Sequence, residues 1–216
     1  MVQNEYFERD LDLLIERIRD FVDPNTMDGL LRVRDKLVDM GRRLLVKINH
    51  SVMEVLVARH LLEKGFIVDV EHNLGNNIVC DVYGERGSVV HIVEVETGFV
   101  PPENALDPVT YWNIRVAAKI ARYSIFSHKF SLAVPPYHIL KIPEIFLEPP
   151  ESRSDESLVM LKGLVDRYYR NPPITIDELK KAHLETIIIV NVDRLETSEL
   201  TLNNYMKLHN VDYFYF

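Results

Sequence analysis

The stretch of the chain from residue 50 to 135 alternates between helical and strand-like patterns in a restrictive order. Ser51 and Glu54 have the spacing of a capping box, which predicts a helix that starts at Ser51, and Gly65 is placed to end it. A second helix is expected over residues 109–127. Apolar runs predict four strands, at residues 66–70, 78–83, 89–95 and 130–134. The predicted order is α-β-β-β-α-β, an α/β core with a mixed central sheet.

The chain on either side of this core is predicted to form two additions, one helical and one with helices and strands. Residues 1–48 form a predicted N-terminal helical extension, with a break at Pro24 because proline disfavours helix in the residue before it. Residues 137–216 form a predicted C-terminal α/β addition packed on the same domain as the core at 50–135. The other expected features are a loop at 73–77, a hairpin turn at 84–87, an exposed acidic loop at 144–156, helices at 157–169 and 177–183, and strands at 185–192 and 211–216.

Composition and charge narrow the function classes. The chain of 216 residues has 47% hydrophobic residues and a formal net charge of −8, so it is not a generally basic DNA-binding protein. No apolar run reaches the roughly 18 residues of a membrane span, and the N-terminus lacks the pattern of a signal peptide. The single cysteine, Cys80, excludes an intrachain disulfide. We therefore expect a cytoplasmic, intracellular protein without membrane contact. Phosphate-binding glycine loops are absent, which predicts no nucleotide cofactor.

Carboxylates interrupt two of the predicted strands. Asp81 lies in the second strand, and Glu94 and Glu96 flank Val95 in the third, where residues two apart point to one face of the sheet. The hairpin can bring Asp81 beside this pair, and Glu54 of the preceding helix can pack over the same end. The simpler alternative is that Asp81 and Glu96 are ordinary solvent-facing strand residues.

Converging carboxylates are costly to bury unless a cation offsets them. Oxygen ligands of this type suit Mg²⁺ or Mn²⁺. A divalent ion held by carboxylates can activate water and stabilise the charge that develops on a phosphodiester. The pattern is therefore typical of a metal-dependent nuclease.

These residues resemble the core of the PD-(D/E)xK nuclease superfamily, especially its archaeal Holliday-junction-resolvase-like branch. The resemblance rests on Glu54, on Gly65-Phe66 before the first strand, on Cys80-Asp81, and on Val93-Glu94-Val95-Glu96. It covers about residues 50–135. The chain also looks like small nuclease-fold proteins of crenarchaeal viruses. The resemblance implies a restriction-endonuclease-like fold, with metal held by Glu54, Asp81 and Glu94.

The sequence departs from this family where the family has its lysine, because Glu96 occupies that position. Some members with glutamate there remain active, and others move the lysine to a neighbouring element. Glu96 would then be a further metal ligand or a base that orients water. Lys119, on the predicted helix at 109–127, is the candidate replacement lysine that stabilises charge.

The same helix carries basic residues at helical spacing. Arg115, Lys119 and Arg122 lie on one predicted face, and Lys129 follows shortly after. They form either a solvated basic face or a track for DNA phosphates beside the metal site.

Aromatic and histidine side chains near this core have structural alternatives. Tyr111 and Trp112 can stack on a base, although aromatics at such positions more often lie in a core or an interface. His72 and His91 lack the spacing of a zinc site and are expected to be structural.

Two functions from different classes follow. The first is a Mg²⁺- or Mn²⁺-dependent deoxyribonuclease acting on double-stranded, branched or recombining DNA. In it Asp81, Glu94, Glu96 and Lys119 would be catalytic, and Arg115, Lys119, Arg122 and Lys129 would bind DNA. The second is a nuclease-fold protein without catalysis, a DNA-binding or assembly factor. Whether Lys119 reaches the carboxylates discriminates between them. The resemblance also implies a homodimer, with the N-terminal helices and the segment 211–216 as candidate interfaces.

Overall fold

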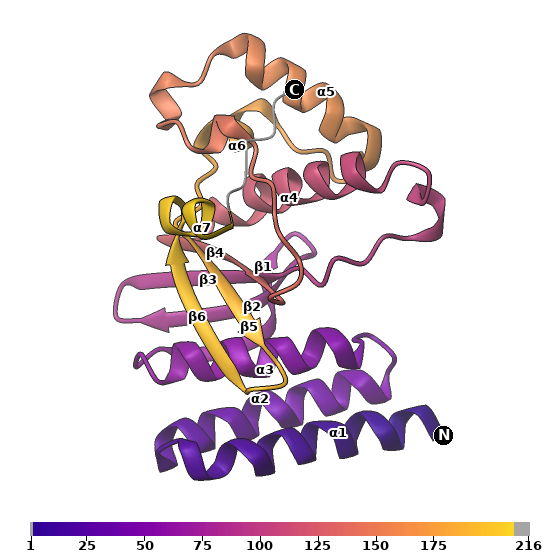
Figure 1. The fold of residues 1–216 in the computed structure, drawn as a ribbon, viewed down its shortest axis with the longest axis vertical. Helices are drawn as coiled ribbons and strands as arrows, with labels where there is room; N and C mark the ends of the chain where they lie inside the picture. The colour runs from indigo at the N-terminus through magenta and orange to yellow at the C-terminus, as the bar shows by residue number, and fades with distance from the viewer. Residues whose placement is uncertain (1, 210–216) are drawn as a thin grey trace.

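The structure, a computed structural model, describes residues 2–209. The described chain is an α/β protein in which one six-stranded mixed sheet lies between two layers of helices (Figure 1). The strands follow one another across the sheet in chain order. They are β1 (Ile67–Gly75), β2 (Ile78–Arg86), β3 (Val89–Val95), β4 (Lys129–Val134), β5 (Thr186–Asn191) and β6 (Glu196–Thr201).

Strand direction changes at both sides of the sheet. β1, β2 and β3 form antiparallel pairs, β3, β4 and β5 run parallel, and β6 returns antiparallel to β5. The parallel steps require long crossovers, which carry the helices on one face. The carboxyl ends of β3, β4 and β5 therefore lie at one edge of the sheet, where ligand sites of open α/β sheets usually lie.

Three helices cover one face of the sheet, and those that follow β3 lie on the other (Figure 1). The first layer, at the N-terminal end, consists of α1 (Val2–Ile18), α2 (Pro24–Arg42) and α3 (Ile48–Leu62). The second contains α4 (Pro108–Ser124), α5 (Asp155–Tyr168), α6 (Ile176–Lys181) and α7 (Leu202–His209). Each layer packs its apolar side chains against the sheet in a separate core, which is how the two faces are shielded from water.

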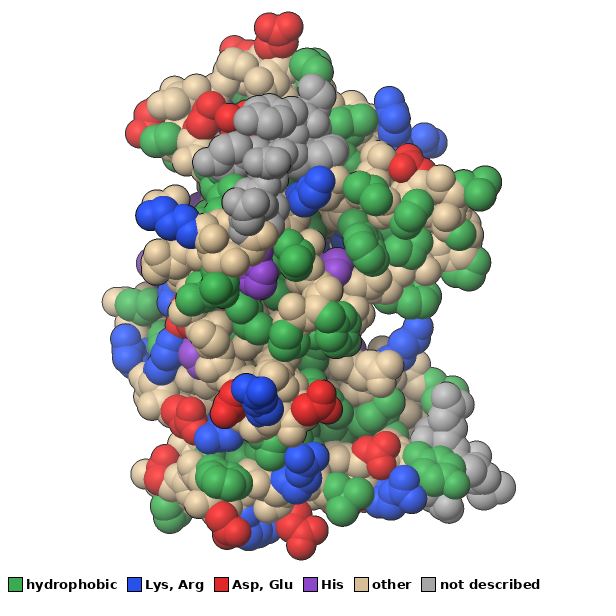
Figure 2. Space-filling view, viewed as in Figure 1, with side chains coloured by type: hydrophobic (Ala, Val, Ile, Leu, Met, Phe, Trp, Pro, Cys, Tyr) green, Lys and Arg blue, Asp and Glu red, His purple; other side chains and the backbone are tan. Residues whose placement is uncertain are grey.

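The N-terminal helices form as expected, with different ends. Asp23 caps α2, because its Oδ1 accepts hydrogen bonds from the backbone N–H groups of Asn25 and Thr26 at 2.9 and 3.2 Å. The helical extension expected over residues 1–48 stops short of that bound, because α2 ends at Arg42 and Leu44 has a positive φ of 59°. Charged side chains of both signs are interleaved over this layer in Figure 2, and Arg42 pairs with Glu8 at 2.7 Å.

The core elements appear in the predicted α-β-β-β-α-β order, and Gly65, with φ of 78°, follows the first helix as expected. The predicted capping box is wrong. Helix α3 begins one turn earlier, with Lys47 as its N-cap, so Ser51 and Glu54 lie inside the helix. The first hairpin turns at Asn76 and Asn77, whose positive φ angles of 52° and 60° suit a two-residue hairpin turn. Strand β1 therefore extends to Gly75, into the predicted loop at 73–77.

The C-terminal region departs most from expectation. The segment 144–156 contains two short 3₁₀ helices and buries Ile145 and Phe146 rather than forming an exposed loop. Arg153 is also buried, and its guanidinium donates hydrogen bonds to the backbone carbonyls of Glu148 and Leu179. The sequence pattern missed β6 and α7. The strand expected at 211–216 lies outside the described residues.

No helix within residues 2–209 is long and apolar enough to cross a membrane.

Candidate metal centre

The site begins where β2 and β3 separate. The two strands pair as far as Val82 and Val93. Beyond that point side chains replace the backbone ladder: the N–H of Asp81 donates to Glu94 Oε1 at 3.0 Å, and the N–H of Val95 donates to Asp81 Oδ2 at 2.7 Å. The opening between the strands therefore fixes both carboxylates by backbone hydrogen bonds.

Lys119 of α4 fills the side of this opening that faces the helix. Its Nζ lies 3.2 Å from Asp81 Oδ2, 3.0 Å from Glu94 Oε2 and 3.0 Å from Glu96 Oε1. One turn earlier on α4, Arg115 Nε donates to both oxygens of Glu96 at 2.9 Å. We call Lys119, Arg115, Asp81, Glu94 and Glu96 the lysine cluster. Its two cations come from one helix face, at the spacing at which helix residues are neighbours.

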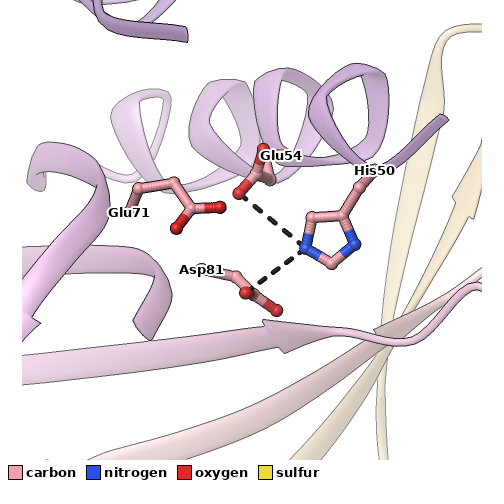
Figure 3. A group of neighbouring side chains, drawn as sticks. All are labelled: His50, Glu54, Glu71 and Asp81. Atoms are coloured by element: carbon pink, nitrogen blue, oxygen red, sulfur yellow. Dashed lines mark ion pairs between the residues drawn. The ribbon is translucent and has the colours of Figure 1, made fainter. Parts of the chain in front are cut away.

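The second oxygen of Asp81 faces a different group (Figure 3). Oδ1 lies 3.3 Å from His50 Nε2, and the same nitrogen lies 3.8 Å from Glu54 Oε1. Ligand atoms of His50, Glu54, Glu71 and Asp81 all lie within 4.8 Å of one another. We call these four residues the acidic cluster. Asp81 belongs to both clusters and joins them.

Glu71 reaches the acidic cluster through an irregularity in β1. Val70 pairs with Val82 and His72 with Cys80, but Glu71 between them has a positive φ of 46°. Such a backbone conformation costs a non-glycine residue about 1–3 kcal/mol, and it persists where the surrounding structure imposes it. The facing strand changes too, because Cys80 lies in the core beneath α4 while Val82, two residues on, lies in the core beneath α3. Strain at a carboxylate that converges with three other polar groups is typical of a functional site.

The carboxylates of the two clusters fall into two groups by the direction in which their pKa is shifted. Burial, aided by the charge of Asp81, raises the pKa of Glu54, of Glu71 and of Glu94. Burial also opposes ionisation of Asp81, but Lys119 and His50 outweigh it and lower the pKa of Asp81. Burial acts likewise on Glu96, and Lys119 and Arg115 lower its pKa. The pKa is therefore lowered where a carboxylate's partners outweigh burial, as at Asp81 and Glu96, and raised where burial prevails, as at Glu94 despite its contact with Lys119.

Glu54 is the residue whose environment is least satisfied. Its side chain is fully buried, and neither carboxylate oxygen accepts a hydrogen bond of normal geometry. A buried polar group without a partner is costly and rare in folded proteins. Three carboxylates and one imidazole within reach of one another form a donor set that fits a divalent cation. The acidic cluster therefore fits a metal ion, and such an ion would satisfy Glu54.

Four of the predicted acidic residues meet, but they divide between the clusters. Glu54 and Asp81 lie in the acidic cluster, whereas Glu94 and Glu96 bind Lys119. Lys119 reaches three of these carboxylates, which is the feature that discriminates between the two predicted functions.

The four predicted DNA-binding residues do not form one track. Arg115 and Arg122 line the same pocket as Lys119, with a volume of about 260 Å³, and Arg122 also donates to the carbonyl of Pro172 at 2.7 Å. Lys129 lies on the other face of the sheet, where it pairs with Glu199.

The aromatic and histidine residues have structural partners. Tyr111 is buried, and the ring of Trp112 contacts that of His138 with centroids 4.7 Å apart. His91 bonds Ser131 Oγ at 2.8 Å, and His72 bonds Asp69 at 2.7 Å.

Sequence reasoning missed His50 and Glu71. Once α3 is known to start at Ile48, His50 stands one helical turn before Glu54 and shares its face. The signal for His50 was therefore present, but the misplaced capping box hid it. Nothing in the sequence marks the irregularity that turns Glu71 toward the cluster.

Comparison of the chain with models of known protein families, with curated proteins and with solved structures finds no match.

Proposed function

We propose that this protein is a deoxyribonuclease that depends on a divalent metal ion and hydrolyses phosphodiester bonds. The observation that carries the proposal is Glu54, a fully buried carboxylate without a hydrogen-bond partner that faces Glu71, Asp81 and His50. This arrangement is difficult to explain as a means of stabilising the fold, because it leaves a polar group unsatisfied. It is readily explained as a site that a cation completes.

The proposal includes the fold family. The order α3-β1-β2-β3-α4-β4 is the order of the PD-(D/E)xK core to which the sequence is similar. Glu96 stands in the family's lysine position, and Lys119 reaches the same carboxylates from α4. This geometry supports a lysine that has moved to a neighbouring element, and it favours the catalytic interpretation over an inactive DNA-binding or assembly factor.

Glu54, Glu71 and Asp81, with His50, would hold Mg²⁺ or Mn²⁺. When bound, such an ion supplies Lewis-acid stabilisation of phosphodiester charge and lowers the pKa of a water molecule. The chain's own groups supply the rest. Lys119 places a positive charge in a largely buried position, where it acts strongly on charge that develops on a phosphate. Glu94 and Glu96 fix the position of Lys119.

Arg115 and Arg122 at the pocket are the candidate phosphate-binding groups. They would concentrate positive charge beside the site on a chain whose net charge is −8. Branched or recombining DNA as substrate, a homodimer as the active form and a cytoplasmic location also belong to this proposal.

A cleavage assay tests the proposal. Labelled duplex, single-stranded, flap and four-way-junction DNAs are incubated with the protein in Mg²⁺, Mn²⁺ or EDTA. Asp81→Ala is compared with Asp69→Ala, a control on β1 whose carboxylate pairs with Lys36 at 2.8 Å outside both clusters. We expect metal-dependent cutting that Asp81→Ala abolishes and Asp69→Ala retains.

Two results would count against the nuclease. Cutting that persists in EDTA would remove the role of the metal. Wild-type protein that binds DNA in every condition without cutting it would leave the DNA-binding or assembly factor as the better description.

A further inference from the structure

A groove separate from the two clusters opens at the carboxyl ends of the parallel strands. Its volume is about 840 Å³, within the range of sites that hold organic ligands. The first turns of α3 form one wall, and the segments that follow β3, β4 and β5 form the others, at residues 97–99, 135–137 and 190–193. The groove thus lies at the edge of the sheet where α/β proteins usually bind ligands.

The groove is continuous with the candidate metal centre along the chain. Asn49 in its wall precedes His50 of the acidic cluster, and Thr97 follows Glu96 of the lysine cluster. A polymer bound at the clusters would therefore lie near residues that line the groove.

Two aromatic side chains line the groove and are exposed to an unusual degree. Phe99 is 61% exposed and Tyr137 is 84% exposed, although aromatic side chains normally bury most of their surface. Figure 2 shows hydrophobic side chains gathered on this side of the molecule, over the segment that leads into α4. Exposed rings on loops beside a site are typical of stacking platforms for bases.

A lysine stands beside the groove, whose only charged lining residue among those described is Asp193. Lys47 Nζ lies 5.3 Å from the centre of the Phe99 ring. Lys47 is also the N-cap of α3, and Asn49 in the first turn of that helix lines the groove, so the positive end of the helix dipole lies near it. Aromatic rings combined with a cation and a helix N-terminus match a ligand that carries both flat apolar surfaces and phosphates.

We propose that this groove binds unpaired nucleotides of a DNA strand whose phosphate backbone continues into the clusters. The identity of the polymer rests on the proposed nuclease function. Unpaired bases expose their faces and can stack on Phe99 and Tyr137, whereas the bases of a blunt duplex are already stacked on one another. The groove therefore selects DNA with single-stranded segments over continuous duplex.

Binding in EDTA tests the groove without requiring cleavage. Fluorescence anisotropy compares a labelled single strand with a blunt duplex for three proteins at one fixed salt concentration, because nucleic-acid affinity depends on salt. The test protein is the double variant F99A/Y137A, and its matched control is Y6A/F21A, which removes an exposed tyrosine and an exposed phenylalanine elsewhere. All four side chains are exposed, so these proteins are expected to fold normally.

We expect F99A/Y137A to bind the single strand about fivefold or more weakly than wild type, from the loss of base stacking. Duplex binding should stay within about twofold, and Y6A/F21A should match wild type on both DNAs. As a second measurement, a 2-aminopurine base in the single strand should lose fluorescence on binding to wild type and keep it with F99A/Y137A.

Three results would overturn the groove proposal: no single-strand binding by wild type, an unchanged affinity in F99A/Y137A, or an equal loss for both DNAs. Each is distinct from failure of the nuclease proposal, which appears as absence of metal-dependent cutting. Single-strand binding that depends on Phe99 and Tyr137 in a protein that never cuts DNA would retain the groove and reject the nuclease.

Discussion

Replacing Glu54 by methionine is expected to stabilise the metal-free protein and to remove its response to a divalent cation. The wild-type side chain buries a carboxyl group whose oxygens have no hydrogen-bond partner of normal geometry. Methionine has a similar length, fills the same space and needs no partner, so it avoids the cost of burying that group. The same change removes a ligand of the acidic cluster.

The magnitude follows from the burial. An unsatisfied buried polar group costs about 1–3 kcal/mol, so the free energy of unfolding in EDTA should rise by about that amount. For a chain of this size, each kcal/mol corresponds to a rise in Tm of roughly 2–4 °C. Wild type should gain about 2.7 kcal/mol from a cation at 100 times its Kd, and Glu54→Met should gain much less. The cation should therefore remove most of the variant's advantage or reverse it.

Urea unfolding followed by circular dichroism, in EDTA and in Mn²⁺, measures both effects. Glu63→Met is the control, because Glu63 is the C-cap of the same helix, is exposed and pairs with Arg59 at 2.6 Å. It should shift stability by less than about 1 kcal/mol and keep the full response to Mn²⁺. A Glu54→Met protein that is less stable than wild type in EDTA, or that responds to Mn²⁺ as wild type does, would refute the reasoning.

Two other variants test the electrostatics. Lys119→Met leaves the carboxylates of the lysine cluster without their central cation and should destabilise the protein by about 3–5 kcal/mol in urea unfolding. The control Lys162→Met, which breaks a surface ion pair with Asp166, should cost less than about 1 kcal/mol. Similar losses of stability in the two variants would contradict this reasoning. Burial and the nearby Lys129 lower the pKa of His91 to about 3. Below pH 6.5 the unfolded state therefore takes up a proton at this residue that the folded state does not, so the free energy of unfolding decreases as the pH is lowered. From about pH 7.5 to about pH 5, wild type should lose roughly 2 kcal/mol more than His91→Gln, and parallel pH curves would contradict this.

The order of elements in the core was predictable because each has a local cause. Gly65 ends α3 in a positive-φ conformation, and the apolar runs that follow it are too close together to be anything but hairpin strands. Element ends were less predictable. The Ser51–Glu54 spacing is that of a capping box, yet the apolar face of α3 extends to Ile48, and packing of that face against the sheet prevails over the local signal.

The C-terminal elements were missed for a different reason. Glu196 to Thr201 has little apolar character, so no period marks it as a strand. It becomes one because it lies beside β5 and completes that strand's hydrogen bonds, while Glu199 pairs with Lys129 and His60. Pairing of this kind is a tertiary effect that a single sequence does not display.

The carboxylates of the site were found from their position in apolar strands, but their partners were not. Period-two alternation places Glu94 and Glu96 on one face, and the structure keeps them there beside Lys119. Glu71 enters the site only because the strand is irregular at that residue, with φ of 46°. A pattern that assumes regular strands assigns Glu71 no special position, so the sequence alone does not predict the full acidic cluster.

Charge balance explains how a third carboxylate can be buried at this site. Glu96 adds a negative charge beside Asp81 and Glu94. Helix α4 compensates with two cations one turn apart, since Lys119 contacts all three carboxylates and Arg115 donates to both oxygens of Glu96. This compensation ends at Asp81, because the ion pairs of Lys119 and Arg115 reach no further into the acidic cluster. In our proposal a metal ion offsets the burial cost of that cluster, so loss of Lys119 and loss of the metal should be separable in experiment.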